Sequence, residues 1–158
     1  MGLVPRSMKT TSKNMNLPNK FKVLKKNYSE TSYVVFFKKS FCKVIVGKKN
    51  KKLLNQICKK NKNFFFITPY NQFSKQTSLI KNMQRFNELN KFLKKKSFNY
   101  FPGEAIPHSQ NWSTEKGFFV FDKKCFINFF LKKYKQNAVL YSNLVSDPYF
   151  IWNQNLNF

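Results

Sequence analysis

Two short apolar runs constrain the fold of this chain more than any other feature. Residues 64–68 read Phe-Phe-Phe-Ile-Thr, and residues 118–121 read Phe-Phe-Val-Phe. Short apolar runs without a polar alternation are typical of strands that are buried on both faces. A sheet with two such strands needs other elements packed against both of its faces. The runs therefore predict a layered fold in which helices cover a sheet.

Helical periodicity between the runs supplies the predicted cover. At residues 79–93, apolar side chains recur every three to four positions opposite a polar face. This pattern predicts an amphipathic helix of about four turns, and Thr77 or Ser78 is placed to cap its first turn. A shorter helix is expected at 51–60, and a third at 122–134 with Asp122 as its cap.

Strands account for most of the remaining apolar segments. Residues 33–37 and 41–46 predict a hairpin, 99–101 a short strand, and 138–141 and 149–152 the last two strands. The order is strand, strand, helix, strand, helix, short strand, strand, helix, strand, strand. We therefore expect one α/β domain, with α+β as the alternative, that holds a mixed sheet of about five to seven strands and about three helices.

The length and the N-terminal segment indicate one domain behind a basic tail. A chain of 158 residues can bury a core without disulfides or metal ions. Residues 2–7 resemble a thrombin-type linker, so 1–7 are interpreted as a tag or linker remnant. Residues 8–27 contain six lysines and no acidic residue, and we interpret them as a flexible tail. Residues 28–158 are expected to form the single domain.

Cysteine use and hydropathy indicate a reducing, aqueous compartment. Cys42, Cys58 and Cys125 are widely spaced and form no Cys-x-x-Cys pair, so neither a disulfide framework nor a zinc knuckle is predicted. All three fall on apolar patterns and are expected in the core. No segment approaches the roughly 20 apolar residues of a membrane-spanning helix, and the N-terminus lacks a secretory signal. We expect a cytoplasmic protein that holds no metal and no cofactor.

The charge balance is extreme and admits two interpretations. The chain has 30 Lys and Arg residues against 6 Asp and Glu residues, a formal net charge of +24. Such a field attracts RNA, DNA or another polyanion. The basic residues are almost all lysine, and Lys, Asn and Phe all have A/T-rich codons, so an A/T-rich genome would also produce this composition. Arginine, the usual choice for specific phosphate contacts, is nearly absent.

The lysines that could bind nucleic acid form two clusters. One surrounds the first predicted helix, and the other ends the long helix, where cations also suit the helix dipole. Both clusters predict binding to phosphates without sequence preference, whereas the aromatic residues fall on core positions and not on a stacking platform. The candidates are Lys48, Lys49, Lys51, Lys52, Lys59, Lys60, Lys62, Lys94, Lys95 and Lys96.

Polar motifs recur along the domain in a fixed order. They are Thr68-Pro69-Tyr70-Asn71-Gln72, Asn82, Pro102-Gly103-Glu104, Trp112 with Glu115, and Gln136-Asn137-Ala138. In this order and spacing, residues 28–152 resemble an uncharacterised bacterial family of domains of unknown function. That family shows Thr-Ala-x-Asn-Pro after a strand, a helix that opens with Asn, a Gly-Glu loop, a Trp followed by an acid, and a Gln-Asn-Ala triplet. The resemblance implies the fold and no particular activity.

Three positions depart from the family pattern. Pro69 and Gln72 stand where the family has alanine and proline, so the turn after the strand is expected to differ. Gly117 replaces the serine that follows the Trp–acid pair, so any role of that hydroxyl would be absent here.

Several polar residues lie where α/β domains place ligand sites, at the ends of strands. Thr68 and Asn71 precede the long helix, whose N-terminus could hold an anion, and they could equally make turn and capping hydrogen bonds. Gln136 and Asn137 could cap a helix end instead of binding a ligand. The ligand-binding candidates are Thr68, Asn71, Asn82, Trp112, Gln136 and Asn137.

A catalytic site is only weakly indicated. Glu104 and Glu115 flank His108, the single histidine, and a carboxylate beside an imidazole can make a general base. The same three residues could form a partial metal site. The alternative is a structured loop whose glutamates pair with lysines. There is no nucleophile elbow, P-loop or dinucleotide fingerprint, so the prediction leans away from an enzyme.

Two functions remain in competition. The first is a nonspecific RNA- or ribosome-associated accessory domain, suggested by the charge and the basic tail. The second is a small-molecule or anion-binding domain, with an enzyme included, whose pocket the Thr68, Glu104 and Gln136 loops would form together.

Overall fold

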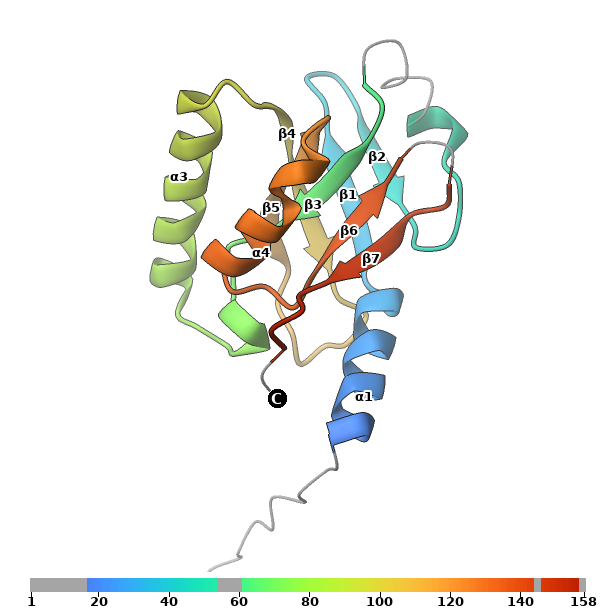
Figure 1. The fold of residues 1–158 in the computed structure, drawn as a ribbon, viewed down its shortest axis with the longest axis vertical. Coiled ribbons are helices and arrows are strands. Elements are labelled where there is room, and N and C mark those ends of the chain that lie inside the picture. Colours follow the sequence, from blue (N-terminus) through green and yellow to red (C-terminus); the bar gives the residue numbers. More distant parts are fainter. Residues whose placement is uncertain (1–16, 54–60, 144–145, 157–158) are drawn as a thin grey trace, which may run out of the picture.

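The computed structural model describes residues 17–53, 61–143 and 146–156, which form one sheet with helices packed against it (Figure 1). The strand order is β2-β1-β4-β5-β3-β6-β7. The strands are Ser32–Phe36 (β1), Phe41–Val44 (β2), Phe64–Ile67 (β3), Asn99–Ile106 (β4), Glu115–Phe121 (β5), Ala138–Ser142 (β6) and Tyr149–Trp152 (β7). The helices are Leu17–Glu30 (α1), Leu79–Lys95 (α3) and Ile127–Lys133 (α4), with 3-10 turns at Gln72–Ser74 (η1) and Lys124–Phe126 (η2). The predicted single domain of sheet and helices is confirmed.

Every strand pair in the described sheet is antiparallel, which differs from the expected mixed sheet. The reason lies in the two helical crossovers. α3 connects β3 to β4, and α4 connects β5 to β6, but each pair of parallel strands has an antiparallel strand inserted between them. From β3 to β6 this is the β-α-β-β-α-β order of the ferredoxin-like arrangement. The fold therefore falls on the α+β side of the predicted class.

The two faces of the sheet are covered differently. α3 and α4 pack on one face, where Phe65, Leu89 and Phe130 belong to one buried cluster. The other face holds a second cluster that includes Phe64 and Phe66. Because neighbouring β3 residues point to opposite faces, the apolar run at 64–67 is buried throughout, as predicted.

The sheet curls so that its two edges approach each other. Tyr33 of β1 lies 6.2 Å from Phe150 of β7, measured between ring centroids. The backbone N–H of Gly47 donates to the carbonyl of Pro148 at 2.9 Å. α1 lies at one end of this curl and contacts β7 through Phe21, whose ring is 5.1 Å from that of Trp152. The second face is thus a concave surface with a helix at its end.

The helix α1 occupies residues 17–27 of the segment 8–27 that was expected to be a flexible tail. Residues 17–30 are helical, and the part of the tail before residue 17 lies outside the described residues. Phe21, Leu24 and Tyr28 follow helical spacing, and Phe21 and Tyr28 contact the aromatic rings of β7. The surrounding lysines obscured this periodicity in the sequence.

Other local expectations are corrected in the same way. β4 continues to Ile106, into a segment expected to be irregular, because it pairs with both β1 and β5. Asp122 does not cap a helix: its Oδ1 accepts from the backbone N–H groups of Lys62 and Asn63. Cys125 is exposed, whereas Cys42 is buried as expected. The helix expected at 51–60 is present at 51–53, and its remainder lies outside the described residues.

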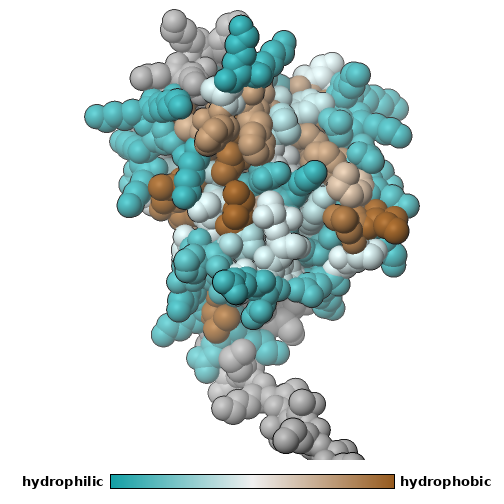
Figure 2. Space-filling view, turned by 180° about the vertical axis from the view of Figure 1, so that it is seen from behind, coloured by the Kyte–Doolittle hydropathy of each residue, from teal (hydrophilic) through white to brown (hydrophobic). Residues whose placement is uncertain are grey.

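The long helix α3 confirms the clearest periodic pattern but not its whole apolar face. The Ser78 side chain accepts from the backbone N–H of Lys81, so Ser78 is the cap. Leu79 and Ile80 are 69% and 73% exposed, because the helix is buried only from Asn82 onward. Seen from behind, hydrophilic side chains cover much of the surface, and apolar patches lie between them (Figure 2). Within the described residues, no helix has the length and apolar character needed to cross a membrane.

Candidate functional site

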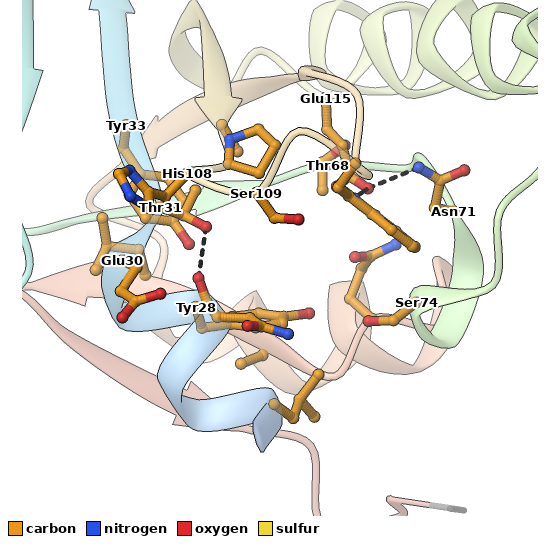
Figure 3. Close-up of a pocket in the computed structure, with 18 of the residues that line it drawn as sticks. Tyr28, Glu30, Thr31, Tyr33, Thr68, Asn71, Ser74, His108, Ser109 and Glu115 are labelled. Atoms are coloured by element: carbon orange, nitrogen blue, oxygen red, sulfur yellow. Dashed lines mark hydrogen bonds between the residues drawn. The ribbon is translucent and has the colours of Figure 1, made fainter. Parts of the chain in front are cut away.

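A cavity of about 320 Å³ lies at the end of the concave face, beneath α1 (Figure 3). Because the sheet is antiparallel, the C-terminal ends of β3 and β4 meet the N-terminal ends of β1, β5 and β6 at this end. Residues distant in sequence therefore surround one space, with α1 contributing the remaining wall. The apolar lining includes Phe66, Ala138 and Leu140 of the sheet.

A reciprocal pair of asparagines holds the loop that follows β3. The side-chain oxygen of Asn82 accepts from the backbone N–H of Asn71, and the Asn82 amide nitrogen donates to Asn71 Oδ1, each at 3.0 Å. Asn71 Oδ1 also accepts from the backbone N–H of Thr77 at 3.0 Å. Both asparagines are buried. These hydrogen bonds fix the side chain of Asn71 in one orientation.

This loop has an unusual backbone. Asn71, Phe73 and Ser74 have φ values of 44°, 50° and 55°, in the left-handed region that residues other than glycine rarely occupy. Side-chain and backbone bonds hold it there, including a 2.6 Å bond from the N–H of Phe73 to the carbonyl of Lys135. Backbone strain of this kind concentrates at functional sites.

Glu115, at the start of β5, is the group that these bonds present to the cavity. Its Oε1 accepts from Asn71 Nδ2 at 2.8 Å and from the indole Nε1 of Trp112 at 2.9 Å. No donor among the described residues contacts its second oxygen, Oε2. Burial raises the pKa of Glu115, and the two hydrogen bonds lower it in part. The cavity thus contains one fixed carboxylate with an open oxygen.

Hydroxyl and amide groups line the wall opposite Glu115. Tyr28 of α1 faces the cavity beside Ser74, whose hydroxyl accepts from Asn137 Nδ2 at 2.8 Å (Figure 3). Burial raises the pKa of Tyr28 to about 12, against the lowering effect of its hydrogen bonds with Ser74 and Asn137. Tyr28 is therefore a neutral hydrogen-bonding group at ordinary pH.

The structure brings together most of the residues proposed from the sequence. Thr68 lines the cavity, but its hydroxyl donates to the carbonyl of Lys116 and accepts from the N–H of Tyr70. Gln136 also lines it, and its amide donates to the carbonyl of Tyr70. Asn82 and Asn137 support the lining from outside. The predicted residues that border the space are Thr68, Asn71, His108, Trp112, Glu115 and Gln136.

The proposed trio of Glu104, His108 and Glu115 is only partly assembled. His108 and Glu115 line the cavity, but Glu104 does not. Glu104 lies in β4 opposite Lys116, one position away from Ala105, which does face the cavity. Among the residues the structure describes, no group of three His, Cys, Asp or Glu side chains could hold a metal ion.

The α1 and β1 side of the cavity was not predicted. Tyr28, Glu30 and Tyr33 line that side and were not among the candidates, and neither was Ser74 of η1. The only sequence signal for Tyr28 and Tyr33 is their position next to the start of β1. The residues that line the cavity with them are far away in the sequence.

Gly117 explains one departure from the expected family pattern. A Cβ at this position would lie 2.6 Å from Cζ of Phe66 and would also clash with the carbonyl of Ile67. No space for a serine side chain exists on this face of β5, so glycine is required by the packing of Phe66.

Comparison with known proteins supports the resemblance over part of the chain. Residues 67–139 match the model of a family described as protein of unknown function (DUF3293). The match is narrower than the expected range of 28–152 and runs from the end of β3 to the start of β6. It includes the cavity residues Thr68, Asn71, Trp112, Glu115 and Gln136. No curated protein and no solved structure matches the chain.

Proposed function

We propose that this chain, with its segment from a family of unknown function, is a small-molecule-binding domain whose ligand occupies the cavity beneath α1. The observation that supports this most directly is the arrangement around Glu115. Asn82 bonds to Asn71, and Asn71 and Trp112 both donate to Oε1 of Glu115, which leaves Oε2 without a bond to the described residues. A fixed polar group in a mostly apolar concavity is the usual form of a ligand site.

The cavity also has the dimensions of such a site. Its volume of about 320 Å³ falls within the range of roughly 300–1,000 Å³ for small-molecule pockets. The apolar lining would hold the body of the ligand, and Glu115 would accept a hydrogen bond from it. The proposal is limited to binding, because the hydrogen bonds of Glu115 to described residues involve Asn71 and Trp112 and no nucleophile.

A fragment screen by nuclear magnetic resonance tests this proposal. Trp112 and Trp152 give two indole N–H signals, and that of Trp112 arises from the group bonded to Glu115. We expect a set of fragments to shift the Trp112 signal in a saturable manner. A variant with Ala138→Leu, which fills the cavity, should lose these shifts.

The neighbouring residue supplies the control for that variant. Val139 points to the opposite face, so Val139→Ile adds volume to the α3–α4 side and should leave fragment binding unchanged. Fragments that bind Ala138→Leu as well as the unmodified chain, or a screen in which no fragment moves the Trp112 signal, would refute the proposal.

RNA association is a second proposal, and lysine exposure favours it. All eight described candidates, Lys48, Lys49, Lys51, Lys52, Lys62, Lys94, Lys95 and Lys96, are exposed, while Lys59 and Lys60 lie outside the described residues. The aromatic clusters are buried, so the proposal concerns phosphate contacts alone. Replacing Lys94, Lys95 and Lys96 together by Glu should weaken binding to a single-stranded RNA and reduce its salt dependence. Equal binding by this variant would refute it.

Both proposals are consistent with a cytoplasmic, reducing location, which we also propose. Cys42 and Cys125 are free thiols in the described part of the chain. Labelling of the native protein with a thiol reagent, without prior reduction, should modify the exposed Cys125.

A further inference from the structure

The charge of the cavity lining is opposite to the charge of the chain as a whole. Lys and Arg make up 30 of the 158 residues, yet among the described residues no Lys or Arg lines the cavity. Two of the six acidic residues, Glu30 and Glu115, do line it. A site for phosphate or carboxylate ligands would have the reverse composition. The lining therefore disfavours an anion and favours a ligand that donates hydrogen bonds.

The two carboxylates differ in how their charge is balanced. Glu30 lies 3.9 Å from the ammonium group of Lys26, one turn earlier on α1, and both are exposed. Glu115 is half-buried and has no ion-pair partner among the described residues. Its hydrogen-bond partners in the described part of the chain are the neutral donors of Asn71 and Trp112. A buried carboxylate without a counterion is costly, and a cationic ligand would supply the missing charge.

Aromatic rings line the cavity that contains the open oxygen of Glu115. The indole of Trp112 is held next to it by the 2.9 Å bond from Nε1 to Oε1. Tyr28 and Tyr33 also line the cavity, and the charge of Glu115 contributes to raising the pKa of both. Aromatic faces attract organic cations, and more strongly where water is excluded. A carboxylate among aromatic rings suits an ammonium group.

We propose that the ligand is an organic primary amine whose ammonium group donates to Glu115 Oε2, in the cavity that Trp112, Tyr28 and Tyr33 line. This inference rests on the proposed function, since it assumes that the cavity binds a small molecule. The apolar body of the amine lies against Phe66, Ala138 and Leu140. The net positive charge of the chain does not oppose this at close range, because surface charges are screened over about 8 Å at physiological salt.

Matched probes that differ only in the polar group test the inference. We would use three sets, each an amine, an alcohol and a carboxylate on the same body: 2-phenylethylamine with 2-phenylethanol and phenylacetate, and the corresponding benzyl and cyclohexylmethyl sets. Affinity is measured by calorimetry and by the Trp112 indole signal. We expect the best amine to bind about tenfold or more tightly than its alcohol, as one charge-assisted bond allows, and the carboxylates not to bind.

Two substitutions that each remove one negative charge assign the effect to Glu115. Glu115→Gln keeps an oxygen for Asn71 and Trp112 and should abolish the preference for amines. Glu88→Gln, at an exposed position on α3, should preserve it. Circular dichroism confirms that both variants are folded before their affinities are compared.

Each result separates this inference from the proposed function. Alcohols that bind as tightly as amines, or a preference for carboxylates, would overturn the amine inference and leave the binding function in place. Equal loss of amine binding in Glu88→Gln would also overturn the inference. If no probe of any set binds and the fragment screen is empty, both proposals fail together.

Discussion

The two faces of the sheet are both rich in buried aromatic residues, but only one of them borders a cavity. On the α3–α4 side, rings fill the space from Phe118, stacked on Phe86 at 4.6 Å, to Phe130, 5.6 Å from Phe65. On the concave side, Phe66 packs against Tyr33 at 5.4 Å between ring centroids, and both rings also border the cavity. One face thus provides an uninterrupted core, and the other provides a core and a site. The contrast suggests that the packed face supplies stability that the open face gives up.

The neighbouring residues Phe65 and Phe66 offer the strongest test of this contrast. Phe65→Ala should lower the free energy of unfolding by about 3–5 kcal/mol, as removal of a fully packed ring does. Phe66→Ala should cost about 1 kcal/mol less, because one side of its ring already faces the cavity. Urea denaturation of both variants measures the difference. Equal losses would show that the open face is packed as tightly as the covered one.

A substitution at Gly117 tests how closely β5 packs against Phe66 on the concave face. Gly117→Ser, which restores the residue expected from the family pattern, should lower the free energy of unfolding by about 3 kcal/mol through overpacking. A second substitution, Phe66→Leu, should recover part of this loss by removing the ring that the new side chain meets. Thermal denaturation of the single and double variants measures both effects. A stable single variant would mean that the backbone of β5 has room to move.

A substitution at Asn82 tests the hydrogen bonds by which α3 holds the loop of Asn71. Asn82→Ala should lower the free energy of unfolding by about 2 kcal/mol, because the N–H and Oδ1 of Asn71 lose a buried partner. The matched control is Asn87→Ala on the exposed side of the same helix, which should change stability by less than about 0.5 kcal/mol. The Trp112 indole signal should also move in Asn82→Ala, since Asn71 positions Glu115. An unmoved signal would remove Asn82 from the support of the site.

Glu115 gives the smallest expected change, and its sign is opposite to the others. The pKa of Glu115 is higher in the folded state than in the unfolded state, so the folded state binds the proton more tightly. The free energy of unfolding therefore decreases as the pH rises from the unfolded pKa to the folded pKa. Glu115→Gln should therefore be at least as stable as the unmodified chain at neutral pH, and its advantage should vanish below the unfolded pKa of about 4.5. Four further titratable residues of the described chain line the cavity: His108, Tyr28, Glu30 and Tyr33. Glu88→Gln is the control for the loss of one negative charge. Melting temperatures across pH 4 to 8 measure the trend, which a constant or reversed difference would contradict.

The sequence predicted the elements of this fold better than their arrangement. The buried runs at 64–67 and 118–121 and the periodicity of α3 depend on local patterns, and the structure confirms them. The insertion of β5 between β3 and β4 is a long-range pairing, so alternation along the chain could not predict an antiparallel sheet. The helix α1 was missed because its three core-facing residues are spread among lysines.

The sequence predicted which residues line the cavity better than it predicted the role of each residue. The motif order identified Thr68, Asn71, Trp112, Glu115 and Gln136, which converge on the cavity. The role of each residue depends on which of its atoms make hydrogen bonds within the protein. Only the three-dimensional structure shows that Asn71 and Trp112 both donate to Glu115. Glu104 was misplaced, because a one-residue step along an unrecognised strand turns a side chain to the opposite face.

The two sides of the cavity come from separate stretches of the chain. The segment that matches the family contains Glu115 and the side chains that hold it, whereas Leu24, Asn27 and Tyr28 belong to α1, outside that match. The carboxylate of the proposed site and the α1 side of the cavity are therefore encoded in separate segments of the chain. Exchanging α1 is a route to altered ligand selectivity that leaves the carboxylate, its two donors and the sheet beneath them untouched.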